Sequence, residues 1–312
     1  MVQTDRSIEV SIAAHFVPDR AKFLALSLDA INQWNCPQIK VVLVTNDMAL
    51  AQDDAVAASV KQLALAGRDV TFDLAKGLAH PWHLTWWHKH RLEEWVEHAS
   101  ADDLFCYMED DIALPAGAMD YFAGHLTAAK SHGLIPGFLR YEMSASQRKI
   151  STDFRSHQVI EQSHLVDVQG VPFVPLQYPY WAGFMLDREL ASEYLQSPWS
   201  NIESADAQPQ SRGHSCRVQS AWGLTYHHVP KAMPSRIAVP VNDQLKPLDE
   251  CLVWHTPNNY SASRMHGFGT IPIEHVFARA GVAAQISNLA LAVRRLGQRI
   301  VRKLAQMFRD SA

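Results

Sequence analysis

Short apolar runs alternate with helical patterns through the first third of the chain, and this alternation restricts the fold more than any other feature. Apolar, often β-branched runs typical of strands lie at 8–14, 39–45, 69–74 and 104–108. Helical spacing or alanine-rich composition lies between them at 20–33, 53–66 and 84–98. The run at 39–45 is apolar throughout, as in a strand covered on both faces. The pattern predicts an α/β fold in which helices cover both faces of a parallel sheet.

The composition is that of a globular protein. The chain has 312 residues, 47% hydrophobic and 19% charged, which suits one large domain or two fused lobes. We find no clear linker, so we expect residues 1–130 and 131–278 to be two halves of one domain, the second built of irregular strands and loops. The net charge of −4 argues against nucleic-acid binding. The start (MVQTDRSIEV) lacks a signal-peptide pattern and no apolar run is long enough to span a membrane, so a cytoplasmic location is expected.

The segment 279–312 differs from the rest in charge. Between Arg279 and Arg309 it has seven basic residues and no acidic one, and its apolar residues share one face when placed on a helix. We expect a basic amphipathic C-terminal helix. Such a helix can lie on an anionic membrane surface through 279–309, or it can dock on the body of the protein by its apolar face.

Three adjacent carboxylates follow the strand at 104–108, in the segment FCYMEDDIALP (105–115). Alternation along a strand would point Glu109 and Asp111 to one side and Asp110 to the other. Carboxylates that converge repel one another unless a cation or a proton separates them. Oxygen ligands suit Mg²⁺ or Mn²⁺, which often take phosphate oxygens as further ligands. The cluster therefore suggests a divalent metal that bridges to a diphosphate, the alternative being a solvated acidic turn.

This strand order with a strand-ending Glu109-Asp110-Asp111 resembles glycosyltransferases of the GT-A fold, over roughly residues 8 to 275. The resemblance implies a mixed sheet flanked by helices, with 1–130 as the nucleotide-sugar-binding half and 131–278 as the acceptor-binding half. It also implies that the acidic motif holds a divalent metal and the diphosphate of the donor. Asp111 would be the main metal ligand, with Glu109 beside it. Glu109 and Asp110 would face the ribose, the metal-bound waters or the sugar.

The resemblance extends to two later segments. His255, in CLVWHTPNNY, resembles the late histidine that many GT-A enzymes use as a further metal ligand, and an imidazole ligand favours Mn²⁺ over Mg²⁺. The alternative is a histidine that caps a strand. Glu203 and Asp206 lie where inverting members place the base that deprotonates the acceptor. The alternative is a pair of acids in the first turn of a helix.

The expected contacts with the donor come from the ends of the earlier strands. His15 and Arg20 follow the first strand, where the nucleotide base usually enters, and Asp47 follows the second. Within HPWHLTWWHKHR (80–91), Lys89 and Arg91 are expected to neutralise phosphate charge, and Trp86 or Trp87 to pack against a ring or in a helix.

Two segments of the second half are candidates for the acceptor side. In 180–184 (YWAGF), Gly183 either lets the backbone approach a ligand closely or marks a core strand with a bulge. Arg140 and Glu142 alternate with apolar residues, so they either line the acceptor site or form a surface ion pair.

These features together predict a metal-dependent glycosyltransferase that moves a sugar from a nucleotide-diphosphate sugar to a hydroxyl group. The basic segment 279–309 suggests a saccharide or lipid-linked acceptor at the cytoplasmic face of a membrane, as in surface-polysaccharide synthesis. A metal-dependent nucleotidyltransferase is an alternative, although the region after the first strand (AAHFVPDRAKF) has no glycine-rich phosphate loop. A non-catalytic carbohydrate-binding protein on the same fold is the other.

Overall fold

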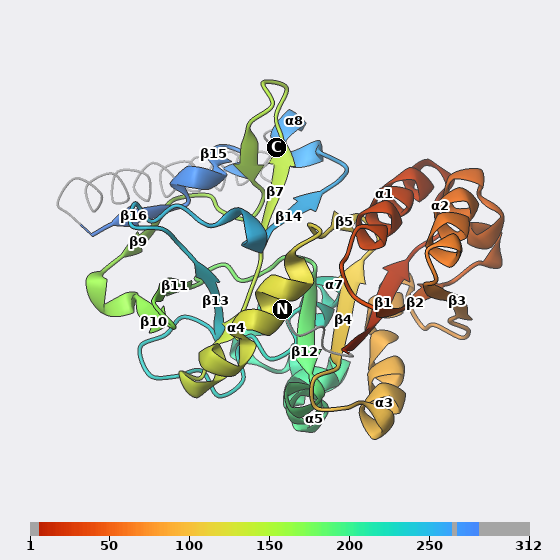
Figure 1. The fold of residues 1–312 in the computed structure, drawn as a ribbon, viewed down its shortest axis with the longest axis horizontal. Helices are drawn as coiled ribbons and strands as arrows, with labels where there is room; N and C mark the ends of the chain where they lie inside the picture. Colours follow the sequence, from red (N-terminus) through yellow and green to blue (C-terminus); the bar gives the residue numbers. More distant parts are fainter. Residues whose placement is uncertain (1–5, 264–266, 281–312) are drawn as a thin grey trace, which may run out of the picture.

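The fold is centred on a five-stranded sheet. A computed structural model describes residues 6–263 and 267–280, and within them this sheet has the order β12-β4-β1-β2-β3, from the centre of Figure 1 to its right-hand side. Its strands are β1 (Ser7–Ala14), β2 (Gln38–Thr45), β3 (Asp69–Leu74), β4 (Leu104–Glu109) and β12 (Gly183–Asp187). β1 to β4 are parallel and β12 is antiparallel to β4. The mixed α/β sheet expected from the sequence is confirmed.

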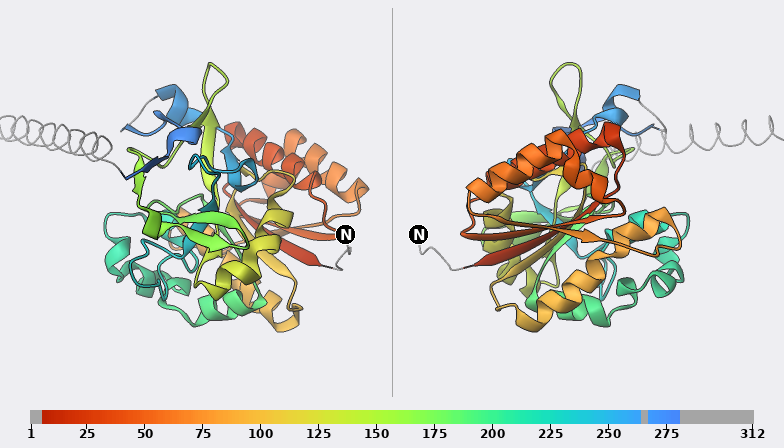
Figure 2. Two further views of the ribbon diagram at one scale, coloured as in Figure 1. Left: turned by 60° about the vertical axis from the view of Figure 1, so that its left-hand side comes forward. Right: turned by 90° about the vertical axis from the view of Figure 1, so that its right-hand side faces the viewer.

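Helices cover both faces of this sheet. On one face lie α1 (Ala21–Asn32) and α2 (Asp54–Leu65), and on the other α3 (His88–His98) and α5 (Arg188–Gln196), as the right-hand view of Figure 2 shows. α2 begins after Asp53 and α5 after Asp187, whose carboxylates accept hydrogen bonds from the first backbone N–H groups. α4 (Ala118–Ser131) ends the first half. α5 is a regular helix within the second half, where the sequence predicted irregular strands and loops.

The second half adds three small sheets. One has the order β15-β8-β7-β14-β5, another β10-β11-β13-β6, and the third pairs β16 with β9. Their strands are β5 (Ile112–Ala113), β6 (Ile135–Pro136), β7 (Leu139–Met143), β8 (Lys149–Ser151), β9 (Gln158–Ile160), β10 (Val166–Val168), β11 (Val171–Pro175), β13 (Ile237–Pro240), β14 (Leu252–His255), β15 (Ile271–Pro272) and β16 (Phe277–Arg279). The short helices α6 (Ile202–Asp206), α7 (Cys216–Ser220) and α8 (Asn259–Ser263) lie between them in sequence. 3₁₀ turns include η1 (Pro18–Arg20), η2 (Met48–Gln52) and η3 (Pro81–Trp86).

The two halves exchange strands. β12 comes from the second half and completes the central sheet, whereas β5 comes from the first half and pairs with β14 in a sheet of the second. A single hydrophobic cluster runs through both halves, from β1 to β16. This exchange places the turn between β4 and β5 at the junction of two sheets.

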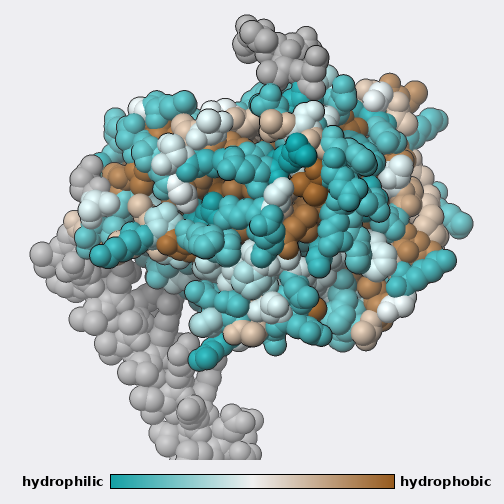
Figure 3. Space-filling model, turned by 90° about the horizontal axis from the view of Figure 1, so that it is seen from below, coloured by the Kyte–Doolittle hydropathy of each residue, from teal (hydrophilic) through white to brown (hydrophobic). Residues whose placement is uncertain are grey.

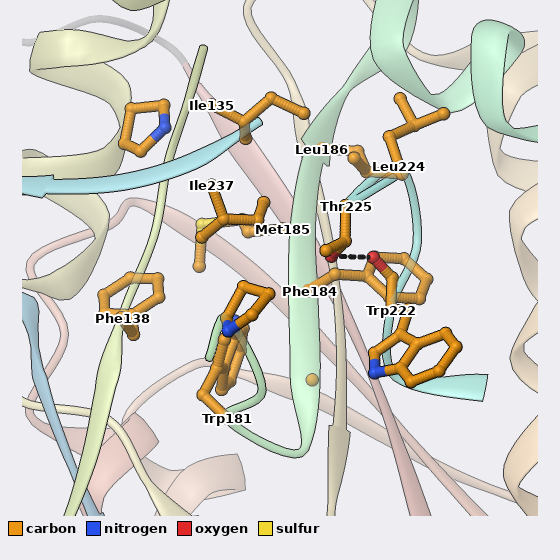
Figure 4. A pocket seen from close by; sticks show the side chains of 13 residues that line it. Ile135, Phe138, Trp181, Phe184, Met185, Leu186, Trp222, Leu224, Thr225 and Ile237 are labelled. Atoms are coloured by element: carbon orange, nitrogen blue, oxygen red, sulfur yellow. Dashed lines mark hydrogen bonds between the residues drawn. The ribbon is translucent and has the colours of Figure 1, made fainter. Parts of the chain in front are cut away.

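β12 is packed on both sides by core residues. Figure 4 shows Met185 with Trp181, Phe138 and Ile237 on one side, and Phe184 with Trp222 on the other. The space among them is only about 10 Å³, close to the minimum for one water molecule, so it is a packing defect and not a ligand pocket. A Cβ atom at Gly183 would lie 2.4 Å from the Tyr107 carbonyl oxygen and 2.6 Å from the Trp181 ring. Gly183 therefore serves close packing between strands. Of the two alternatives for this residue, the structure shows the core strand, which pairs with β4 in a regular register.

The face of the molecule in Figure 3 is mostly hydrophilic, with hydrophobic residues in narrow, interrupted areas. Within residues 6–263 and 267–280, no helix combines the length and apolarity needed to cross a bilayer. Arg279 ends strand β16, so the expected C-terminal helix does not start there. The remainder of that expectation, from 281 to 312, lies outside the described residues.

Candidate functional site

The acidic motif lies between β4 of the central sheet and β5 of the sheet β15-β8-β7-β14-β5, which is called the second sheet below. β4 ends at Glu109, Asp110 and Asp111 form a turn, and β5 starts at Ile112. β5 pairs with β14, and His255 is the register partner of Ile112. The Thr256 backbone N–H donates to the Asp111 carbonyl oxygen at 3.0 Å. Strand pairing thus brings His255 beside a motif that is far away in the sequence.

The turn changes which carboxylates converge. Arg20, from η1, places Nη2 3.1 Å from Asp110 Oδ1 and 2.6 Å from Asp111 Oδ2. Asp110 and Asp111 therefore share one partner, while Glu109 makes separate contacts. The expectation that Glu109 and Asp111 point together and Asp110 points away is wrong, because the strand ends at Glu109 and its alternation does not continue through the turn.

His255 is held in one orientation by a buried carboxylate. Its Nδ1 lies 2.6 Å from Glu142 Oε1, and its Nε2 lies 3.5 Å from Asp111 Oδ2. Glu142 also accepts a hydrogen bond from the Ser261 backbone N–H at 2.6 Å, and its side chain is fully buried. A carboxylate at Nδ1 favours the imidazole with its proton on that nitrogen, which leaves Nε2 to face Asp111.

The residues present fit a divalent cation. Asp111 Oδ1 is buried and, among the described residues, has no hydrogen-bond partner. A neutral His255 would turn the Nε2 lone pair toward the carboxylate of Asp111, and two acceptors at this separation need a cation or a proton between them. Asp111 and His255 form an oxygen–nitrogen donor set with a second carboxylate behind the imidazole, as in many metal sites of proteins. The imidazole favours Mn²⁺ over Mg²⁺.

Burial and charge shift the pKa values of this group in opposite directions. Burial and the neighbouring Asp111 raise the pKa of Asp110 to about 7, although Arg20 opposes the shift. Burial alone would raise the pKa of Asp111, but the hydrogen bond and charge of His255, together with Arg20, hold that pKa well below its usual range. Burial would lower the pKa of His255, but Asp111 and Glu142 raise it overall. The group thus concentrates negative charge on Asp111 and attracts positive charge to it.

Glu109 is fully engaged by two residues that the sequence did not single out for it. The Tyr180 hydroxyl donates to Oε1 at 2.9 Å, and Arg217 on α7 donates from Nε to Oε2 at 2.8 Å and also from Nη2. With both oxygens used, Glu109 is a weaker candidate for a metal ligand than Asp111. Arg217 carried no recognisable signal, because it lies in a short helix with no motif around it.

A cleft of about 270 Å³ opens beside the acidic motif. Its lining includes Glu109 and Asp110, the two arginines Arg20 and Arg217, and His15, Pro81, Trp82, Leu84 and Thr85. The Trp82 side chain is 47% exposed. His15 Nε2 lies 2.8 Å from the Pro81 carbonyl oxygen. Two arginines, an exposed indole and carboxylates around one hollow suit a ligand with anionic, aromatic and hydroxyl groups.

Of the two alternatives for Trp86 and Trp87, the structure favours packing within the protein over packing against a ligand ring. Trp86 is buried and donates from Nε1 to the Cys216 carbonyl oxygen at 2.9 Å. Trp87 donates from Nε1 to Asp73 Oδ2 at 3.0 Å. From the same segment, Trp82 lines the cleft instead. The sequence signal that could have identified it is the preceding proline, which starts a turn.

Arg91 and Lys89 are directed away from the cleft. Arg91 Nη2 lies 3.2 Å from Glu9 Oε1, and Glu9 is the register partner of Phe105, four residues and about 13 Å before Glu109 along β4. Arg91 is therefore near the amino end of the strands and is not placed for the expected phosphate contact. Lys89 Nζ lies 3.6 Å from Glu93 Oε1 on its own helix, a weak exposed pair.

Three other candidates have local roles in the structure. Asp47 is exposed and caps η2 by accepting from the Ala49 N–H. Glu203 is exposed in the first turn of α6, after the Asn201 cap. Asp206 accepts a hydrogen bond from Gln219 Nε2 at 3.2 Å. No described contact joins any of the three to the acidic motif, so the role of Glu203 or Asp206 as a base stays a prediction.

Arg140 and Glu142 do not form the surface ion pair that the sequence allowed. Arg140 is buried and pairs with Asp153 at 2.7 Å, and its guanidinium lies 4.9 Å from the centre of the Tyr180 ring. Glu142 instead orients His255. Both residues belong to β7 and connect the second sheet to the acidic motif.

A second group of possible metal ligands lies apart from this site. Glu193, His227 and His228 place one ligand atom each within 4.8 Å of one another. However, Glu193 Oε1 lies 2.6 Å from Arg236 Nη1. Because a guanidinium already neutralises this carboxylate, the group fits a cation less well than Asp111 and His255 do.

Comparison of the sequence with models of known protein families finds no match, and comparison with curated proteins finds none either.

Proposed function

We propose that the chain is a metal-dependent glycosyltransferase that moves a sugar from a nucleotide-diphosphate sugar to an acceptor hydroxyl group. One observation carries the proposal. The buried Asp111, with one oxygen lacking a partner among the described residues, meets His255 at the end of a parallel strand, beside a cleft that holds two arginines. Ligands of open α/β sheets bind at this end of the strands.

Asp111 and His255 would hold the divalent metal, Mn²⁺ in preference to Mg²⁺. When bound, the metal would supply positive charge that offsets the charge on a departing diphosphate. Arg20 and Arg217 line the same cleft and can donate paired hydrogen bonds to phosphate oxygens. Glu142 keeps the His255 imidazole in the orientation that ligation requires.

The rest of the cleft suits a nucleoside. Trp82 offers an exposed ring face on which a base can stack, and His15 lies beside it. Asp110 places a carboxylate in the cleft, where it can accept hydrogen bonds from ribose or sugar hydroxyl groups. Glu109 also lines the cleft, but Tyr180 and Arg217 already donate to both of its oxygens. A saccharide or lipid-linked acceptor, reached at the cytoplasmic face of a membrane through 279–309, is the part of the proposal that depends on charge pattern alone.

The proposal is tested by ligand-induced thermal shifts. Native protein and the Asp111→Ala variant are heated with a panel of nucleoside diphosphates and nucleotide sugars, with and without Mn²⁺. We expect stabilisation of the native protein that requires both Mn²⁺ and a nucleotide, and none for the variant. The absence of any nucleotide effect on the native protein would overturn the proposal.

The products distinguish transfer of a sugar from transfer of a nucleotidyl group. A glycosyltransferase with the best-binding donor releases a nucleoside diphosphate, whereas a nucleotidyltransferase exchanges pyrophosphate. Release of nucleoside diphosphate in the presence of Mn²⁺ supports the proposal, and pyrophosphate release would replace it with the alternative.

A further inference from the structure

Arg20 forms an unusual contact for a residue that lines a ligand cleft. A single nitrogen, Nη2, contacts both Asp110 Oδ1 and Asp111 Oδ2. Among the described residues, these are the ion pairs of its guanidinium, and the side chain is 34% exposed. Arg20 ends the 3₁₀ turn 18–20, next to the exposed residues 17–19. The guanidinium also lies 5.9 Å from the centre of the Phe23 ring. Because Arg20 lines the cleft and is partly exposed, its guanidinium has room to leave the two carboxylates.

Arg217 is fixed more firmly on the other side of the cleft. It donates from two nitrogens, Nε and Nη2, to one oxygen of Glu109. Two donors on one acceptor hold the planar guanidinium in a defined orientation, whereas the contact of Arg20 through one nitrogen does not. Of the two arginines, Arg20 is the one that contacts the expected metal ligand Asp111, whereas Arg217 contacts Glu109. A metal at Asp111 would therefore require Arg20 to move.

The charges explain why movement is required. Arg20 neutralises part of the charge of Asp110 and Asp111, one of which is the expected metal ligand. A divalent cation beside Asp111 would lie next to the guanidinium of Arg20, and like charges at such distances repel in a buried site. A diphosphate in the cleft gives Arg20 an alternative anionic partner.

We propose that Arg20 is an exchanging counter-ion, which holds Asp110 and Asp111 in the free protein and transfers to the diphosphate when metal and nucleotide bind. The metal and the nucleoside diphosphate then strengthen each other's binding. Each ligand favours the movement of Arg20 from the carboxylates to the diphosphate, and this lowers the free-energy cost of binding the other ligand. This inference depends on the proposed function, since it assigns a binding role to a residue of the same site.

The sign of one mutational effect separates this role from a structural one. If Arg20 competes with the metal, the Arg20→Ala variant binds Mn²⁺ more tightly than the native protein when no nucleotide is present. If Arg20 only keeps the acidic turn in shape, the same variant binds Mn²⁺ with unchanged or lower affinity. In both cases the variant binds the diphosphate less well. The Mn²⁺ affinity measured without nucleotide is therefore the quantity that distinguishes the two roles of Arg20.

The experiment is isothermal titration of Mn²⁺ into full-length protein, alone and with saturating uridine or guanosine diphosphate. We expect the diphosphate to raise the Mn²⁺ affinity of the native protein, and Arg20→Ala to raise the affinity for Mn²⁺ alone by about tenfold and to reduce the coupling. Lys22→Ala is the matched control, because Lys22 is an exposed cation two residues away that lies over the Phe23 ring. It should leave the affinity and the coupling unchanged. Thermal unfolding of each variant verifies that it is folded.

Each outcome has a defined meaning. Weaker or unchanged binding of Mn²⁺ alone to Arg20→Ala, or an undiminished coupling, overturns the exchange. In that case the proposed function still stands if binding to the native protein needs both Mn²⁺ and Asp111. If the double variant Arg20→Ala/Asp111→Asn retains the tighter Mn²⁺ binding, the metal is bound elsewhere and the exchange is also overturned.

Discussion

The buried acids at the two ends of the central sheet differ in how many basic partners they have. At the amino end, both oxygens of Glu9 have a basic partner, since Lys40 lies 2.8 Å from Oε2 and Arg91 lies 3.2 Å from Oε1. At the carboxyl end, Glu109, Asp110 and Asp111 share Arg20 and Arg217, and Asp111 Oδ1 is left without a partner among the described residues.

The comparison distinguishes a structural ion-pair group at the amino end from a candidate ligand site at the carboxyl end. One acid with two bases is satisfied by the protein itself. At the carboxyl end, four acids, with Glu142 included because it contacts His255, face two arginines and one histidine, and one oxygen of Asp111 has no partner among the described residues. Such an arrangement in a buried place is costly unless a cation contributes. The difference in partners, and not the presence of acids, is the reason why we propose the carboxyl end as the ligand site.

The largest effect is expected from the carboxyl end. Asp111→Asn keeps the size of the side chain but removes the charge that binds the cation, so we expect Mn²⁺ affinity to fall by roughly a hundredfold or more. Titration calorimetry with Mn²⁺ measures the loss. Asp19→Asn, which changes an exposed acid next to Arg20, is the control and should have no effect. If Asp111→Asn and the native protein bind Mn²⁺ equally well, Asp111 is not a metal ligand and the proposed difference between the two ends of the sheet is wrong.

A smaller effect is expected from the residue behind His255. Glu142→Gln weakens the hydrogen bond that orients the imidazole or the one from Ser261, so Mn²⁺ affinity should fall by about 10- to 100-fold. Nitrogen-15 NMR of the labelled histidine side chains measures the proton position on His255 directly. We expect the proton on Nδ1 in the native protein and a mixture in the variant. Glu274→Gln, at an exposed pair with Arg148, is the control.

A substitution at the amino end should lower the stability of the fold and should not change ligand binding. Glu9→Gln leaves Lys40 and Arg91 without their shared carboxylate, so we expect a loss of about 1–3 kcal/mol in the free energy of unfolding, measured with denaturant. Mn²⁺ and nucleotide binding should stay within about twofold of the native values, since the residue lies at the other end of the strands. A large loss of binding would mean that the two ends are coupled.

The smallest effect concerns pH. Burial and Asp111 raise the pKa of Asp110 from its ordinary value of 3.8 to about 7, so in this interval the folded protein keeps a proton that the unfolded chain has released. Stability therefore falls as pH rises from about 4 to about 7. Asp110→Asn removes this contribution, and its melting temperature should fall less over that interval in metal-free buffer. Parallel curves for the two proteins would show that Asp110 does not titrate as described.

The sequence was most informative where local pattern determines structure. The apolar runs at 39–45 and 104–108 became β2 and β4, because a strand that is buried on both faces has a continuous apolar signature. Arg20 and His15 were predicted at the ligand because parallel strands end at one edge, and both line the cleft. His255 was placed beside Asp111 only through resemblance, and strand pairing now accounts for it.

The sequence was least informative where distant segments decide a side chain's partner. Arg91 lies in α3, which begins two residues after Trp86 and directs Arg91 toward Glu9. Glu142 alternates with apolar residues as a surface residue would, but β14 covers it with His255. Arg217 reaches Glu109 from a short helix. Such contacts depend on tertiary packing, for which residue type and spacing give no signal.

The most direct test of the account is to locate a bound cation. Crystals of the protein grown with Mn²⁺ and a nucleoside diphosphate, measured for anomalous scattering from manganese, give its position without reference to activity. The account predicts a peak at coordination distance from Asp111 Oδ1 and His255 Nε2, with the diphosphate in the cleft lined by Arg20 and Arg217. A peak at Glu193, His227 and His228, or none near Asp111, would contradict it.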